Sequence, residues 1–123
     1  MPVFAFRNAA MEGETFFDMI VSGEVSVEIL LENEYAVVVS DINPQAPTHV
    51  LIIPKKKVER ISEASSDDAY MLGQLLLTAK EFSEMRELSG FRLVINNGRQ
   101  AGETIPYLHV HLLSGRPMAW PPG

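Results

Sequence analysis

The chain has 123 residues, of which 46% are apolar and 21% charged, values that are typical of one globular domain and exclude a disordered chain. The net charge of −6 disfavours binding to a nucleic-acid backbone, because such affinity comes from clustered Lys and Arg. The absence of cysteine excludes a disulfide scaffold, a thiolate zinc site and a cysteine nucleophile. No apolar run approaches the roughly 20 residues of a membrane span, so we expect a cytoplasmic protein without a membrane or nucleic-acid partner.

The first half of the chain is predicted to contain a flexible arm over residues 1–13, a short helix and three strands. Thr15 is a suitable N-cap and Gly23 a suitable terminator for a helix over residues 16–22. Two prolines three positions apart predict a loop over residues 41–47. β-branched and apolar residues predict strands over 25–31, 35–40 and 49–54.

The second half changes to a helical period, because apolar residues recur at intervals of three and four between residues 67 and 88. Gly90 is the expected residue after the end of this long helix. Two further strands are predicted over residues 91–96 and 107–113. The order of elements predicts an α+β fold, with a five-stranded antiparallel sheet, one short helix and one long helix, and both helices on one side of the sheet.

The chain has three histidines, and two of them lie two residues apart in the last predicted strand. Alternate residues of a strand point to the same face, so His109 and His111 share a face with Tyr107. Neighbouring imidazoles repel when both are protonated, so at least one should be neutral and nucleophilic at neutral pH. Taken alone, the pair could also be two solvent-facing histidines, or part of a three-histidine zinc site that includes His49.

A polar, glycine-containing segment over residues 96–104 comes just before the histidines. Its glycines allow the backbone to approach a ligand and to direct successive N–H groups at an anion. No Gly-Lys-Ser/Thr sequence follows, so the segment is not a Walker A phosphate-binding loop. By itself it is either a phosphate-binding loop or a plain connection between strands.

Three stretches resemble the histidine triad superfamily, most closely its nucleoside phosphoramidase branch, the histidine triad nucleotide-binding proteins. They are Asp41 to Lys56, Asn96 to Arg116, and the tail Trp120-Pro121-Pro122-Gly123, which favours this branch over the dinucleoside polyphosphate hydrolases. The resemblance extends over nearly everything after Gly13 and implies one histidine triad domain over residues 14–123. The family motif is His-φ-His-φ-His-φ-φ with φ apolar, and this chain departs from it at Tyr107.

The resemblance implies a covalent mechanism. His109 would attack the α-phosphorus of a nucleotide, and water would then release a nucleoside monophosphate from the nucleotidyl-histidine. The backbone carbonyl of residue 107 would hold the proton on the other nitrogen of His109, whatever the side chain there. We expect the Tyr107 hydroxyl either to contact His49, near which the first family histidine lies, or to narrow the site.

The resemblance also implies the remaining site residues. Catalysis would involve His49, Thr104 and His111 beside His109. Asp41 would accept hydrogen bonds from the two ribose hydroxyls. The other nucleotide contacts implied are Asn96, Gly102, Glu103 and Thr104 near the α-phosphate, Phe17, Ile20, Ile42 and Leu51 around the base, and Trp120 near the leaving group.

Family members form dimers that join two sheets, and Trp120 would reach the site of the partner. The expected activity is therefore cleavage of P–N bonds in purine nucleoside phosphoramidates, with aminoacyl adenylates as a further substrate, by a homodimer that needs no metal and no cofactor. Three alternatives stay open: hydrolysis or transfer at P–O–P bonds of dinucleoside polyphosphates, a nucleotide-binding module with weak activity, and a zinc-binding protein.

Overall fold

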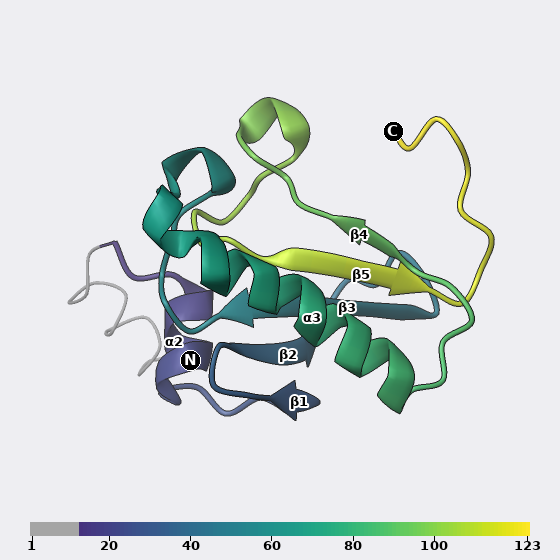
Figure 1. The fold of residues 1–123 in the computed structure, drawn as a ribbon, viewed down its shortest axis with the longest axis horizontal. Coiled ribbons are helices and arrows are strands. Elements are labelled where there is room, and N and C mark those ends of the chain that lie inside the picture. The colour runs from purple at the N-terminus through teal and green to yellow at the C-terminus, as the bar shows by residue number, and fades with distance from the viewer. Residues whose placement is uncertain (1–12) are drawn as a thin grey trace.

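A five-stranded antiparallel sheet forms the centre of the protein, for which a computed structural model describes residues 13–123 (Figure 1). The strands follow the order β1-β2-β3-β5-β4 across the sheet. Their bounds are β1 (Leu31–Glu32), β2 (Ala36–Ser40), β3 (Thr48–Pro54), β4 (Arg92–Val94) and β5 (Val110–Ser114). The predicted α+β class and the five antiparallel strands are therefore confirmed. The predicted arm lies, except for Gly13, outside the described residues.

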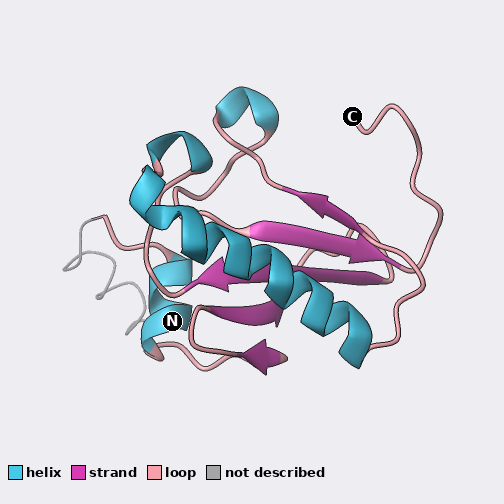
Figure 2. Ribbon diagram, viewed as in Figure 1, coloured by secondary structure: helices cyan, strands magenta, loops and turns pink. Residues whose placement is uncertain are grey.

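Within residues 13–123, two helices accompany the sheet, α2 (Phe16–Ser22) and α3 (Ala69–Met85), together with short 3-10 turns over 61–63, 66–68 and 99–101 (Figure 2). The short helix has the predicted ends, since Thr15 and Asp18 form a reciprocal capping box and Gly23 adopts a left-handed conformation. The long helix is shorter than predicted, because Glu87, with φ of 53°, turns the chain away well before Gly90. Among residues 13–123, no helix combines the length and apolar composition needed to cross a membrane.

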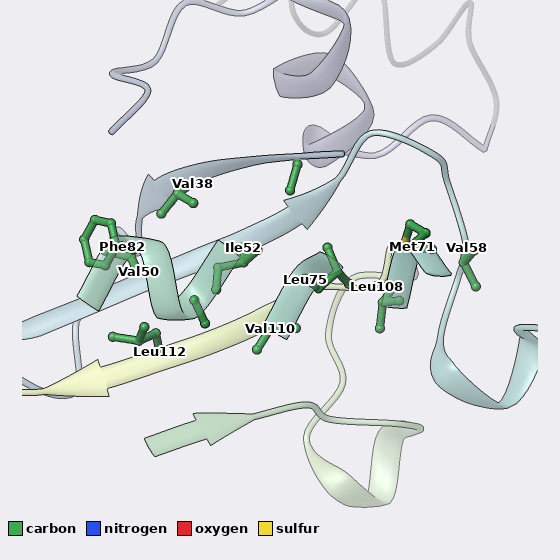
Figure 3. Packing of buried hydrophobic residues seen from close by; sticks show 12 residues of the cluster. Val38, Val50, Ile52, Val58, Met71, Leu75, Phe82, Leu108, Val110 and Leu112 are labelled. Atoms are coloured by element: carbon green, nitrogen blue, oxygen red, sulfur yellow. The ribbon is translucent and has the colours of Figure 1, made fainter. Parts of the chain in front are cut away.

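The helices cover opposite faces of the sheet, so the prediction that both lie on one side is wrong. On one face, Leu75 and Phe82 of α3 pack against a buried cluster that includes Ile52 and Val110 (Figure 3). On the other face, Phe17 and Ile20 of α2 pack on a second cluster, formed with Val37, Val39, Leu51, Ile53 and Tyr107. The reason is visible in β2 and β3, whose apolar residues are buried on both faces and therefore need a cover on each side.

The predicted strand over residues 25–31 is also wrong for most of its length, since pairing with β2 begins only at Leu31. Val25 and Val27 instead pack, partly buried, against the cluster below α2. The last strand begins later than predicted, at Val110, because the backbone N–H of Leu108 donates to Val58 rather than to a neighbouring strand. Alternation is kept nonetheless: Leu108, Val110 and Leu112 face α3, whereas Tyr107 faces α2.

Candidate functional site

A pocket of about 400 Å³ opens beside α2 and brings together most of the residues predicted from the sequence. Predicted residues that line it are Phe17, Ile20, Asp41, Ile42, Leu51, Asn96, Gly102, Thr104, His109 and His111. Residues that the sequence did not single out are Phe16, Val27, Glu28, Val39, Ser40 and Ile105. Val39 could have been found by alternation, because it shares a strand face with Asp41. The pocket is apolar toward α2 and polar toward the histidines.

His109 is held with one ring nitrogen toward the pocket and the other toward its own backbone. Its Nδ1 lies 2.7 Å from the carbonyl oxygen of Tyr107, which confirms the expected contact. A carbonyl can only accept, so Nδ1 carries a proton, and in the uncharged ring the lone pair is on Nε2. The ring of Phe17 lies edge-on to the imidazole, with 4.8 Å between ring centroids, and restrains its orientation. The arrangement leaves Nε2 as the ring nitrogen that can act on a ligand in the pocket.

His49 and His111 form a hydrogen-bonded pair whose proton positions are set by a backbone amide. The N–H of Gln45 donates to Nδ1 of His49 at 3.0 Å, so the proton of the neutral His49 ring is on Nε2. That nitrogen lies 2.9 Å from Nδ1 of His111 and donates to it. The proton of His111 is therefore on its Nε2, where it is available to a ligand in the pocket.

His111 is neutral as well as correctly protonated for donation. Burial lowers its pKa to about 4, and the neighbouring His109 and His49 act in the same direction, against a smaller opposite effect of Asp41. His49 is buried and does not line the pocket. It contacts the pocket wall through the hydrogen bond to His111.

Tyr107 does not take either of the roles predicted for its side chain. Its hydroxyl donates to the carbonyl oxygen of Pro54 at 2.6 Å, so the expected contact with His49 is wrong. The ring is 1% exposed and belongs to the buried cluster below α2, not to the pocket wall, so it does not narrow the site either. Burial raises the pKa of Tyr107 to about 12, which keeps the hydroxyl a donor at neutral pH.

Asp41 lies at the junction of the pocket with the histidine pair. Its Oδ2 is 3.4 Å from Nε2 of His49 and 3.9 Å from Nδ1 of His111. Among the described residues these three side chains form a cluster with ligand atoms within 4.8 Å of one another, a spacing open to a metal ion. Metal binding needs a lone pair on each nitrogen, however, and the amide of Gln45 keeps the proton of His49 on the nitrogen that would have to bind.

The segment between β4 and β5 supplies a polar wall of the pocket through Asn96, Gly102 and Thr104. Gly102, with φ of 100°, closes a 3-10 turn over Arg99–Ala101 and brings its own backbone to the pocket. The Glu103 side chain does not reach the pocket, because its carboxylate is bound by Arg60 and the Gly98 amide. Trp120 is 81% exposed and lies away from the pocket of its own chain, near Arg92.

A family model described as "HIT domain" matches residues 22–118. An uncharacterized HIT-like protein of Synechocystis is 46% identical over 114 residues, which are 92% of this chain and 100% of that protein. A maize protein named "14 kDa zinc-binding protein" is 42% identical over 115 residues, covering 91% of this chain and 90% of the maize protein.

Solved structures are similar along most of the chain. A HIT family hydrolase from Legionella pneumophila has a TM-score of 0.86 at 40% identity, covering 89% of this chain and 100% of that one. A HIT family hydrolase from Clostridium thermocellum has a TM-score of 0.82 at 36% identity, covering 87% of this chain and 95% of that one. The similarity extends to sequence as well as to fold.

Proposed function

Because the chain belongs to the HIT domain family, we propose that it is a hydrolase that cleaves P–N bonds of purine nucleoside 5′-phosphoramidates. Aminoacyl adenylates, in which the bond from the α-phosphorus to the carboxyl oxygen would break instead, are a second substrate class. The observation that carries this proposal is the hydrogen bond that holds Nδ1 of His109 on the Tyr107 carbonyl oxygen, which leaves Nε2 beside a pocket with one apolar and one polar end. The proposal is further supported by the two similar structures, from Legionella and Clostridium, that are named hydrolases.

In the first step, Nε2 of His109 attacks the α-phosphorus and forms a new N–P bond. The P–N bond of the substrate breaks, and the amine takes up one proton from solvent as it leaves. The His111 Nε2–H and the Thr104 hydroxyl donate hydrogen bonds at the reacting phosphate. The attacking imidazole keeps its Nδ1 proton and becomes a cation, which is stabilised by the carbonyl oxygen of Tyr107.

In the second step, water attacks the same phosphorus and the bond to His109 breaks. The products are the nucleoside monophosphate, the neutral imidazole with its Nδ1 proton, and one proton returned to solvent. The proton taken up in the first step is thus released in the second, so the net reaction is hydrolysis of the P–N bond. Both steps use the same tautomer of His109.

The nucleoside would occupy the rest of the pocket. Ile42 is 97% exposed although it is apolar, and a purine lying between it and Leu51 would cover it. Asp41 would accept hydrogen bonds from the ribose hydroxyls, as adjacent donors suit a carboxylate. Asn96 and the backbone around Gly102 would hold the α-phosphate.

The decisive experiment is mass spectrometry of a quenched reaction with an adenosine phosphoramidate. We expect a nucleotidyl adduct on His109, and we expect H109A to bind nucleotide but to form neither adduct nor monophosphate. Turnover by H109A would refute the proposed chemistry. Binding without turnover in the unmodified protein would identify a binding module, and faster cleavage of dinucleoside polyphosphates would move the activity to P–O–P bonds.

Zinc binding is the second candidate function, because the maize relative carries that name and Asp41, His49 and His111 lie together. The residues do not fit, since a zinc ion on Nε2 of His49 would move the ring proton to Nδ1, against the N–H of Gln45. We therefore expect the purified protein to contain zinc well below one equivalent, by elemental analysis. Stoichiometric zinc that is lost on chelation together with activity would contradict this.

We also propose that the protein is a homodimer in which β4 and α3 meet their twofold mates. The proposal is supported by the position of β4 at the edge of the sheet and by Leu76 and Leu77 of α3, which are 53% and 55% exposed. Sedimentation equilibrium should give twice the chain mass of 13.7 kDa. In such a dimer, the exposed Trp120 would lie near the partner's pocket, and W120A should alter the preference for the leaving amine.

A further inference from the structure

Arg60 and Glu103 form an ion pair behind the polar wall of the pocket. The guanidinium Nε lies 2.9 Å and 3.2 Å from the two carboxylate oxygens, and Nη2 lies 2.9 Å from Oε2. The Glu103 side chain is only 10% exposed. Its Oε1 also accepts the N–H of Gly98 at 2.8 Å. Both carboxylate oxygens are thus fixed from two directions, which is the geometry of a strong charge-assisted contact.

The pair lies directly against the pocket, because Gly102 and Thr104, the neighbours of Glu103 in the chain, both line it. The backbone N–H of Glu103 donates to the carbonyl oxygen of Gly98 at 3.1 Å, while the side chain of Glu103 accepts from the Gly98 amide. These two bonds close the loop into a ring. The position of the Gly102–Thr104 backbone therefore depends on the Glu103 side chain.

The chain that follows β3 runs along this loop and braces it. Besides the Arg60 contact, the N–H of Ser62 donates to Asn97 Oδ1 at 2.9 Å and the N–H of Leu108 donates to the carbonyl of Val58 at 2.8 Å. Figure 1 shows the connection between β3 and α3 near the loop between β4 and β5. Arg60 is the charged member of this brace and the one that holds Glu103.

The carboxylate of Glu103 also interacts electrostatically with the ring of His109. The paired Arg60 and the Gly98 amide lower the pKa of Glu103 to about 2, and protonated His109 contributes a smaller lowering in the same direction. The carboxylate is therefore ionised in the working range of pH and within electrostatic reach of the ring. In the proposed reaction His109 becomes a cation when it carries the nucleotide, and a fixed negative charge nearby favours that state.

An anionic side chain beside a phosphate pocket also carries a disadvantage. A carboxylate facing the pocket would repel the phosphate of the substrate. Arg60 prevents this, because the salt bridge holds the carboxylate of Glu103 away from the pocket. The two residues are thus expected to affect different steps.

We propose that Arg60 and Glu103 are positioning residues for the proposed reaction, which this inference presupposes. Glu103 stabilises the cationic nucleotidyl form of His109 and fixes the loop that carries Gly102 and Thr104. Arg60 keeps the carboxylate of Glu103 away from the phosphate. The pair therefore assists covalent transfer without opposing the binding of an anionic substrate.

Three variants separate this proposal from a merely structural role. E103Q keeps the size and an acceptor but removes the charge, so we expect kcat to fall about tenfold with KM changed less than threefold. R60M leaves an unpaired carboxylate beside the pocket, so we expect KM to rise about tenfold. In the double variant R60M/E103Q, KM should fall back toward that of E103Q, because the repelling charge is gone.

A structural role alone would make the double variant at least as defective as R60M, and that result would overturn the proposal, as would an E103Q enzyme with unchanged kcat. K55M is the matched control, because it removes the cation of another salt bridge, the 2.7 Å pair with Glu32, whose residues do not line the pocket, and it should leave both constants unchanged. If R60M does not fold, R60K is the replacement variant, because lysine keeps the charge but loses the two-pronged contact. We expect R60K to raise KM less than tenfold, and an unchanged KM would count against the proposal.

The same assay distinguishes failure of the inference from failure of the proposed function. An unmodified enzyme that forms no adduct on His109 would refute the function itself. Adduct formation in the unmodified enzyme, with kcat and KM equal in E103Q and R60M, would refute only the role of the pair. Thermal melting of each variant shows whether it is folded before its kinetics are compared.

Discussion

Replacing Tyr107 with Phe tests what the residue at the first motif position does. The change removes one hydroxyl and keeps the ring, so the edge contact with Phe17, at 6.2 Å between centroids, is retained. What is lost is the hydrogen bond to the Pro54 carbonyl oxygen, and both residues are almost completely buried. Leaving a buried acceptor without its donor costs about 1–3 kcal/mol of folding free energy. For a chain of this length that corresponds to a melting temperature lowered by about 4–12 °C.

The activity of Y107F should fall much less than its stability. His109 uses the backbone carbonyl of residue 107, which the substitution keeps, so we expect kcat to decrease less than about threefold. Chemical denaturation and steady-state kinetics on the same preparations measure both quantities. Y70F is a suitable control, because Tyr70 is 67% exposed and water can replace its hydroxyl contacts. Unchanged stability, or a folded Y107F with kcat lowered more than tenfold, would refute this assignment of the hydroxyl.

Three further predictions concern stability and binding. G115A should lower the unfolding free energy by at least about 2 kcal/mol, because φ of Gly115 is 98° and the new Cβ would lie 2.8 Å from Cβ of Pro47. G73A, which adds a methyl group in open space on α3, should raise the unfolding free energy by about 0.5–1 kcal/mol, and urea titration measures both changes. The pKa of His111 is lowered in the folded state from 6.5 to about 4, so between these pH values the unfolded chain binds more protons than the folded chain. The unfolding free energy should therefore fall as pH falls from about 6.5 to about 4. H111N should flatten that part of the curve, and an equally steep curve would contradict the assignment. D41N should raise KM about tenfold for a ribonucleoside phosphoramidate but little for its 2′,3′-dideoxy analogue, and equal effects on both substrates would contradict a ribose contact.

Local sequence pattern was sufficient to predict the elements whose ends are set by residues close to them in the chain. The helix over residues 16–22 has its cap and its terminator in the sequence, and both act within a few residues of the chain. The alternation around His109 and His111 likewise needs only the strand period of two. The strand prediction failed over residues 25–30 because local pattern was ambiguous there: Val25 and Val27 are as suitable for packing against the cluster below α2 as for a strand.

Contacts between distant parts of the chain could not be predicted in the same way. Tyr107 was expected to meet His49, yet Pro54 at the end of β3 was nearer to its hydroxyl. The partner of Glu103, Arg60, lies 43 positions away and carries no motif. The best available signal for that pair was a glutamate in an expected phosphate loop, where a negative charge needs a neutralising partner.

The sequence by itself determined the capped short helix, four of the five strands and the shared face of His109 and His111, because these depend on spacing along a few residues. Tertiary structure alone decided that helices cover both faces of the sheet, that the Gln45 amide fixes the protons of His49 and His111, and that Arg60 binds Glu103. The physical reason is register: antiparallel pairing places Leu51 opposite His111, and only this alignment brings side chains about sixty residues apart within hydrogen-bond distance.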